Sequence, residues 1–224
     1  MLGTFCRNRF ASTTILIFAL VSISCDVFGG DWEKVKETDG ITVYSREVPG
    51  SPVLAFKGNG VVNAPIAKVA SAIFDPARAR EWVENLEETR RVRWLSADQF
   101  LQYDHIGTPI VMKDRDFVST VKMKVEPARQ RVVFEYHSTT DPELPETKYV
   151  RGELTSSLFV LTSIDNGTKT NIEGEIHADP KGSVAKWIVN FFQKQWPVTT
   201  LNSLRKQVTK ADIKLDPHFA ALAN

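Results

Sequence analysis

The residue types best suited to acid–base chemistry stand together at Tyr103-Asp104-His105, the one compact Tyr/Asp/His cluster in the sequence. General acid–base catalysis needs such titratable groups within hydrogen-bond reach of a substrate. In a strand, however, successive side chains alternate between the two faces, so Tyr103 and His105 share a face and Asp104 points away from them. The three side chains therefore do not form a relay with one another.

Motifs for other chemistry are absent from the sequence. Neither a Gly-x-Ser-x-Gly motif nor a Walker-type glycine loop occurs, and the four histidines are scattered without the spacing of metal ligands. Both cysteines, Cys6 and Cys25, precede residue 31, so the rest of the chain has no thiol for a nucleophile, a redox pair or a thiolate metal site. We therefore expect no metal site.

The composition is that of a globular domain, with 42% hydrophobic and 25% charged residues among 224. It excludes a disordered chain, a collagen-like fibre and a polytopic membrane protein. Lys and Arg number 28 against 27 for Asp and Glu, a formal net charge of +1. Because nucleic-acid-binding domains normally carry a strong basic excess, we expect no nucleic-acid partner.

Residues 1–30 predict an export signal. Arg7 and Arg9 precede an uncharged stretch that is shorter than the roughly 20 apolar residues of a membrane-spanning helix. Small residues favour cleavage after Gly29, and the alternatives are a lipoprotein anchored through Cys25 or an uncleaved anchor. A signal of this type ahead of a cysteine-free domain favours a bacterial envelope, so we expect an exported, periplasmic protein.

Beyond residue 30, hydrophobic periodicity predicts an antiparallel sheet followed by a long helix. The expected strands are 41–48, 53–62, 88–95, 99–106, 116–125, 131–138, 149–160 (with a bulge at Gly152) and 168–177; helices are expected at 66–73, 77–82 and 183–210. We expect the sheet to curl around the long helix, an α+β architecture. Trp187, Phe191 and Trp196 of that helix face the interior in this reading, where they either fill a core or line a cavity.

Four stretches occur together in one order: Trp32 with 39–44, then 113–119, 144–151 and 184–190. They resemble the START (steroidogenic acute regulatory-related lipid transfer) domain family, and Arg115-Asp116-Phe117-Val118 is one of its most recognisable signatures. The resemblance covers residues 31–210 and leaves 211–224 as a C-terminal tail. It implies the helix-grip fold, a curved antiparallel sheet around a C-terminal helix that encloses a hydrophobic tunnel. It also implies a single bound lipid, such as a sterol or a phospholipid, and no cofactor.

The resemblance implies two sets of ligand-binding residues. The apolar tunnel wall is expected to include Val121, Trp187, Ile188, Phe191, Phe192 and Trp196. Polar candidates for selecting the head group are Tyr103, His105, Arg115, Tyr136, Tyr149, Arg151 and His177, although Arg115 and Arg151 have an alternative role as partners of carboxylates. Some sterol-binding members carry a buried Arg where this chain has Val121, which leaves the ligand class open.

The same resemblance implies a gate formed by an omega loop, residues 138–147, and the C-terminal helix. Leu144 is expected at the apolar tip of that loop, Pro145 stiffens it, and Pro197 gives the helix a bending point. We expect a monomer that transiently contacts a membrane surface. Two alternatives are an enzyme of the polyketide cyclase or hydratase type acting in the same tunnel, and a non-lipid interaction module with a filled interior.

Overall fold

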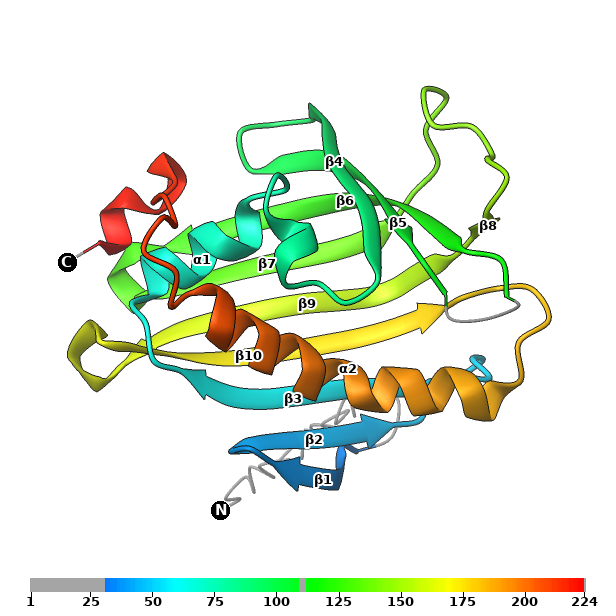
Figure 1. Ribbon diagram of the computed structural model, residues 1–224, viewed down its shortest axis with the longest axis horizontal. Helices are drawn as coiled ribbons and strands as arrows, with labels where there is room; N and C mark the ends of the chain where they lie inside the picture. Colours follow the sequence, from blue (N-terminus) through cyan, green and yellow to red (C-terminus); the bar gives the residue numbers. More distant parts are fainter. Residues whose placement is uncertain (1–30, 109–111, 224) are drawn as a thin grey trace, which may run out of the picture.

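The computed structural model describes residues 31–108 and 112–223, so the predicted export signal lies outside the described residues. The strands are β1 Glu33–Thr38, β2 Ile41–Arg46, β3 Ala55–Val62, β4 Leu86–Trp94, β5 Gln99–Ile106, β6 Arg115–Glu126, β7 Arg131–Ser138, β8 Val150–Arg151, β9 Glu153–Ile164 and β10 Lys169–Asp179. The helices are α1 Ile66–Phe74 and α2 Lys186–Gln207, with short 3-10 turns η1 Ala79–Glu81, η2 Pro127–Arg129, η3 Asp165–Gly167 and η4 Pro217–Leu222. Figure 1 shows α2 running along β10 and β3.

One sheet contains all the described strands, in the order β1-β2-β3-β10-β9-β7-β6-β5-β4. Neighbours along this order pair antiparallel, and the short β8 joins β6 in parallel. The sheet remains open between β1 and β4, and α2 and α1 pack into its concave face (Figure 1). The predicted α+β architecture, a curved antiparallel sheet around a long C-terminal helix, is confirmed.

Most predicted strands lie where periodicity places them, and β5 and β7 have the predicted ends. Strand β1 was missed because its sequence, Glu-Lys-Val-Lys-Glu-Thr, is almost wholly polar and lacks the alternation that reveals a half-buried strand. The predicted strand 149–160 is two strands, divided at Gly152. A Cβ at residue 152 would overlap the ring of Phe117, so the close approach of these strands requires glycine.

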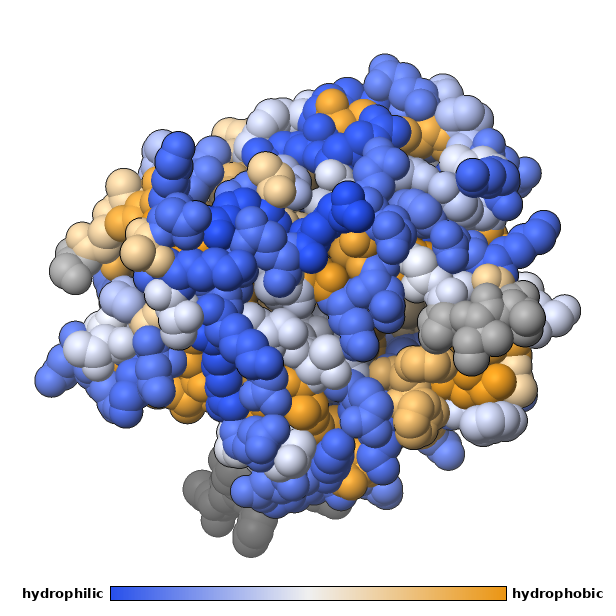
Figure 2. Space-filling model, in the orientation of Figure 1, coloured by the Kyte–Doolittle hydropathy of each residue, from blue (hydrophilic) through white to orange (hydrophobic). Residues whose placement is uncertain are grey.

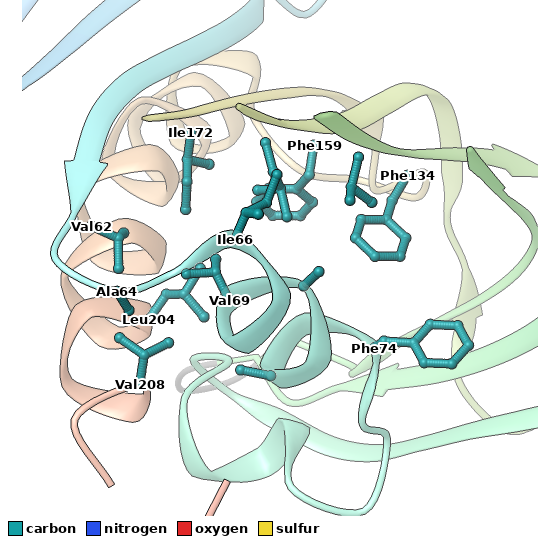
Figure 3. Close-up of a cluster of buried hydrophobic side chains, with 14 of the residues drawn as sticks. Val62, Ala64, Ile66, Val69, Phe74, Phe134, Phe159, Ile172, Leu204 and Val208 are labelled. Carbon is teal, nitrogen blue, oxygen red and sulfur yellow. The ribbon is translucent and has the colours of Figure 1, made fainter. Parts of the chain in front are cut away.

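The core lies between the sheet, α1 and α2. Figure 3 shows Ile66 and Val69 of α1, Leu204 of α2, and Phe134 and Phe159 of the sheet gathered in one buried cluster. Helix α1 is buried along most of its length because its small and β-branched residues allow close packing.

The segment after residue 210 belongs to this core, which corrects the prediction of a tail outside the domain. Phe219 of η4 is fully buried, and its ring centroid lies 5.5 Å from that of Phe74 and 6.0 Å from that of Phe134. Asp216 caps η4 by accepting a hydrogen bond from the backbone N–H of His218 (2.9 Å).

Helix α2 divides at Pro197 into two halves with different surroundings. Pro197 rests on Gly58 of β3 and Leu201 rests on Gly60; a Cβ on either glycine would lie less than 3.0 Å from its neighbour. The C-terminal half is thereby seated in the core, where Leu201 and Leu204 are fully buried. No helix of the described residues is long and apolar enough to cross a membrane.

The N-terminal half of α2 faces the sheet differently from the prediction. Its buried residues are Val189 and Gln193, and Phe191, expected to face inward, points to solvent. The Gln193 amide pairs with the backbone of Ala178 on β10: Nε2 donates to the carbonyl at 2.7 Å, and Oε1 accepts from the N–H at 3.3 Å. A polar residue is buried here because it satisfies a stretch of β10 that β3 no longer pairs.

Candidate functional site

An internal cavity of about 400 Å³ lies between the concave face of the sheet and the N-terminal half of α2. Its wall is rich in aromatic and aliphatic side chains from the sheet, α1, α2 and the segment between α1 and β4. The aromatic members are Phe74, Trp82, Phe100, Phe117, Phe134, Tyr136, Phe159, Phe192 and Trp196. An apolar cavity of this size with a few polar groups is the usual form of a small-molecule site.

Strand β5 presents its even-numbered residues to the cavity. Phe100, Gln102, Asp104 and Ile106 line it, and the odd-numbered residues between them face the opposite side of the sheet. The prediction that Tyr103 and His105 line the tunnel is therefore wrong. Asp104, which was dismissed because it points away from them, is the residue that enters the cavity.

The convex side of β5 has a small core of its own, which explains the error. Leu101 and Tyr103 pack there against Val118 of β6 and Leu144. His105 lies on the same side; its ring stacks on that of Tyr149 at 3.9 Å between centroids, and its Nε2 lies 2.9 Å from Asp114 Oδ2. Tyr149 is thus also outside the cavity. Both faces of β5 bury side chains, so burial alone does not identify the tunnel face.

Arg151 also lies outside the cavity, where it pairs with the fully buried carboxylate of Asp116. Arg151 Nε and one terminal nitrogen donate to the two carboxylate oxygens at 2.9 and 3.1 Å, and the Thr147 hydroxyl donates at 2.9 Å. Burial raises the pKa of Asp116, but Arg151 and Thr147 outweigh burial and hold this pKa below its ordinary value. The alternative role considered for Arg151, pairing with a carboxylate, is the one observed.

Arg115 lines the cavity, but its guanidinium already donates hydrogen bonds to backbone carbonyls. Its nitrogens donate to the backbone carbonyls of Lys113, Pro180 (3.3 Å) and Lys181 (3.5 Å). Arg115 thereby ties the start of β6 to the connection between β10 and α2. Burial lowers the pKa of the guanidinium, and the charge of Asp114 opposes this shift. The side chain closes one end of the cavity as a structural cross-link.

Tyr136 lines the cavity from β7, and its cross-strand neighbour Val121 is fully buried on the same face without lining it. Burial raises the pKa of the Tyr136 hydroxyl, and the charge of Asp104 adds to this shift. His177 was expected in the tunnel but is buried elsewhere: its Nε2 lies 2.9 Å from the Ser51 hydroxyl. Burial lowers the pKa of His177, which favours the neutral ring.

Asp104, Gln102 and Tyr136 are polar members of the cavity wall on the sheet, and Arg91 and Ser157 also line it. Gln102 Nε2 donates to both carboxylate oxygens of Asp104, at 3.0 and 2.9 Å, and Thr89 lies directly opposite Asp104 on β4. Burial raises the pKa of Asp104 above its ordinary value, although Thr89 and Gln102 oppose this shift. Sequence reasoning missed both Gln102 and Asp104. Their spacing of two residues between Phe100 and Ile106 is the pattern that places all four on one face.

On α2, three of the five predicted wall residues line the cavity: Ile188, Phe192 and Trp196. The other two predictions are wrong. Trp187 is 72% exposed and Phe191 is 55% exposed, because the helix turns its Val189–Gln193 face toward the sheet. Phe192 lies at the border between the two environments, since it lines the cavity and is still 46% exposed.

The omega loop, residues 138–147, which was predicted to act as a gate, is held against the sheet by several contacts. Leu144 is 6% exposed and packs in the small core, so it is not the exposed tip that was expected. The Pro145 carbonyl accepts a hydrogen bond from Arg151 (3.0 Å), and Arg93 binds Asp141 and Glu143 of the same loop. Opening this loop would break all these contacts. Pro197, the third residue of the predicted gate, lies where the more exposed N-terminal half of α2 meets the buried C-terminal half.

Within residues 31–108 and 112–223, no three His, Cys, Asp or Glu side chains gather as metal ligands. The site is a largely apolar pocket whose wall also carries polar and charged side chains from several elements.

The sequence matches known proteins along most of its length. A family model described as START domain matches residues 25–212. An uncharacterized protein of Pseudomonas aeruginosa is 25% identical over 198 residues, which cover 88% of this chain and 96% of that protein. The phosphatidylcholine transfer protein of Bos taurus is 22% identical over 169 residues, covering 74% of this chain and 78% of the relative.

Solved structures share the fold. Human STARD10 superposes with a TM-score of 0.74 at 20% identity, covering 80% of this chain and 74% of that one. A STAR-related lipid transfer protein fragment from Xanthomonas axonopodis has a TM-score of 0.70 at 23% identity, covering 80% of this chain and 99% of that fragment. The family model, which spans most of the chain, and the fold agree with the motifs at 113–119 and 184–190: this chain belongs to the START domain family.

Proposed function

We propose that this protein binds one hydrophobic, lipid-like molecule in the cavity beneath α2 and carries or senses it in an extracytoplasmic compartment. The observation that carries the proposal is the aromatic-lined cavity of about 400 Å³. A lipid chain in water costs about 0.8 kcal/mol per methylene, and an apolar cavity removes that cost as a bilayer does. Exchange between membrane and cavity is then close to neutral, as a carrier requires.

The family supports a lipid as the ligand class. Among the relatives, one is named a phosphatidylcholine transfer protein and another a STAR-related lipid transfer protein. We infer the same general activity for this chain and use its own cavity wall, rather than theirs, to consider the ligand.

We propose that the N-terminal half of α2 makes the transient contact with a membrane. Figure 2 shows apolar side chains gathered on the surface there, and Trp187, Phe191 and Phe192 are the exposed aromatic residues. Lys186 and Lys194 flank these aromatic residues, a combination that suits the interface of an anionic bilayer. Because Ile188 and Phe192 of the same half line the cavity, a lipid would enter beside the contact.

The extracytoplasmic location is proposed from the sequence of residues 1–30. The mass of the N-terminal peptide of the protein recovered from a cell-envelope fraction tests it. A chain that begins at residue 30 supports cleavage after Gly29, and a diacylglyceryl group on Cys25 supports the lipoprotein. A full-length chain recovered only with the cytoplasm would overturn the export proposal.

Native mass spectrometry of the protein purified without detergent tests the ligand. An added mass that leaves as a lipid on denaturation is the expected result. A bare protein mass, together with no uptake from mixed-lipid vesicles, would overturn the proposal and favour a non-lipid interaction module.

Two substitutions on α2 separate binding from membrane contact. Ile188→Asp places a charge in the cavity wall and is expected to abolish lipid retention. Phe191→Asp changes an exposed residue, so retention and fold stay intact while binding to anionic vesicles falls severalfold. Leu215→Asp is the matched control, because Leu215 is also exposed but lies outside α2. Vesicle co-sedimentation measures the contact, and equal effects at residues 191 and 215 would refute the assigned surface.

A further inference from the structure

The cavity beneath α2 has room for a limited length of hydrocarbon. Its volume is about 400 Å³. Benzene fills an apolar protein cavity of about 150 Å³, which corresponds to about 25 Å³ for each carbon atom. At this packing the cavity holds about 16 carbon atoms, whereas the two chains of a common membrane phospholipid have about 32 and would need about 800 Å³. The cavity therefore matches the volume of one chain.

A band of aromatic rings in the cavity wall limits this volume. Tyr136 of β7, Phe159 of β9 and Trp196 of α2 all line the cavity. The ring centroids of Tyr136 and Phe159 lie 6.4 Å apart, and those of Phe159 and Trp196 lie 5.7 Å apart. Gly174 of β10 lets two of these rings lie close to the backbone, since a Cβ there would be 3.3 Å from Phe159 and 3.5 Å from Trp196. The rings thus occupy space that a second chain would need.

A second group of rings closes the wall around Phe74. Phe74, Phe100 and Phe134 line the cavity, and the ring centroid of Phe74 lies 5.8 Å from that of Phe100 and 6.3 Å from that of Phe134. Arg91 also lines the cavity, with its Cζ 4.0 Å from the centroid of Phe74 and 4.5 Å from that of Phe100. Phe219 is fully buried against Phe74. A longer chain could extend past these rings only by displacing the core.

The cavity cannot widen without loss of the contacts that hold α2 to the sheet. Gln193 pairs with both backbone groups of Ala178, and Asn190 Oδ1 accepts from the Leu54 N–H. Arg115 joins the start of β6 to the connection between β10 and α2. These contacts return once α2 has closed over a ligand, so the volume of the closed cavity decides what is carried through water.

We propose that the cavity carries a single-chain lipid of about 16 carbon atoms and excludes two-chain phospholipids. This inference rests on the proposed lipid-binding function and adds the number and length of the chains. It follows from volume, so it holds for whichever polar group the ligand carries. A second chain, or the end of a longer one, would remain in water, where each methylene weakens binding about fourfold.

A series of primary alcohols from decanol to docosanol tests the proposal. Each is offered from vesicles of phosphatidylcholine and cholesterol, the protein is separated from the vesicles by gel filtration, and native mass spectrometry identifies and counts the bound molecules. A methylene is buried equally well in a bilayer and in an apolar cavity, so we expect a constant partition ratio between protein and vesicles up to hexadecanol. Beyond that length the ratio is expected to fall about fourfold for each added methylene.

The outcomes separate this inference from the function on which it rests. Retention of one phosphatidylcholine or cholesterol molecule per protein would overturn the single-chain inference and leave lipid binding intact. A partition ratio that stays constant up to docosanol would do the same, because the chain would then not be limited by the cavity. If neither an alcohol nor phosphatidylcholine nor cholesterol is bound, the lipid-binding function is refuted, and this inference with it.

Two substitutions in the cavity wall are expected to move the length limit in opposite directions. Trp196→Ala frees part of the volume of the indole and moves the limit to alcohols roughly four carbons longer. Ile188→Phe adds volume to the wall and moves the limit roughly two carbons shorter. Trp32→Ala is the matched control, because Trp32 lies over Arg46 and does not line the cavity. An unchanged limit in both wall variants, with the fold intact by circular dichroism, would refute the assignment of the limit to this cavity.

Discussion

Replacing Arg151 by methionine is expected to leave the buried carboxylate of Asp116 without its cation. Asp116 is fully buried, and Arg151 supplies two of its charge-assisted hydrogen bonds. Removing one partner of a buried pair costs about 3–5 kcal/mol. The Thr147 hydroxyl remains at 2.9 Å and the Arg151 side chain is 26% exposed, so water can enter and the cost falls near 3 kcal/mol. At roughly 2–4 °C per kcal/mol for a chain of this length, Tm drops by about 6–12 °C.

The two single variants are expected to differ. Asp116→Asn leaves a cation that is partly in contact with solvent, so it costs only about 1–2 kcal/mol. Combining Asp116→Asn with Arg151→Met removes the uncompensated charge and recovers most of the loss. Urea unfolding of the two single variants and the double variant measures these values. Lipid retention by the folded Arg151→Met protein stays unchanged, because this residue does not line the cavity.

The pH dependence gives a second check. The pKa of Asp116 lies below its ordinary 3.8 in the folded wild-type protein, so the pair contributes stability above that pH and loses it as pH falls through the folded value. Without Arg151, burial raises this pKa, and protonation then relieves the penalty. The difference in unfolding free energy between wild type and Arg151→Met is therefore largest at neutral pH and shrinks on acidification. A loss below about 1 kcal/mol at neutral pH, or a difference that grows on acidification, would refute the reasoning.

Two further substitutions probe the packing that holds α2 and the closed end of the cavity. Gly58→Ala is expected to cost about 2 kcal/mol because a methyl group there overlaps Pro197. Gly107→Ala is the control and costs about 0.5 kcal/mol or less, because its methyl group meets the flexible Glu87 side chain and lies at an ordinary 3.6 Å from the Asn85 carbonyl oxygen. Equal losses of unfolding free energy for the two variants, measured with urea, would contradict the close contact between Gly58 and Pro197. Phe219→Ala is expected to cost about 3–5 kcal/mol, because its ring is fully buried; a cost typical of a surface residue would show that η4 is not part of the core.

The element order was predictable because it depends on local pattern. Two-residue alternation located β5 and β7, and helical spacing with a Pro early in the first turn located α1. Strand β1 escaped because an edge strand of charged residues carries no such pattern. The core segment η4 escaped because six residues are too few for a period to show, so only tertiary contact reveals that Phe219 is buried.

The site was predicted less well than the fold, and β5 shows why. Alternation assigns residues to two faces but does not say which face is concave. Here both faces bury apolar residues, Phe100 on one and Leu101 on the other, so neither is marked as the solvent side. Tyr103 and His105 were chosen for their residue types. That choice assigned the convex face of β5 to the cavity in place of the concave face. On α2, aromatic residues were assigned to the interior. Gln193 is buried there instead, because its amide hydrogen bonds to both the N–H and the carbonyl of Ala178.

Because α2 divides at Pro197, we expect the folded conformations of its two halves to have different lifetimes. Amide protons after residue 197 exchange with solvent only when the core that holds Leu201 and Leu204 unfolds. The preceding turns are held by buried Val189 and by hydrogen bonds of two side-chain amides. Gln193 binds the backbone of Ala178, and Asn190 accepts from the Leu54 N–H (3.0 Å). Each such bond contributes about 1 kcal/mol, so we expect these turns to open and reclose more often than the C-terminal half. We therefore expect the residence time of the proposed ligand to depend on these two side-chain amides, with no movement of the sheet required.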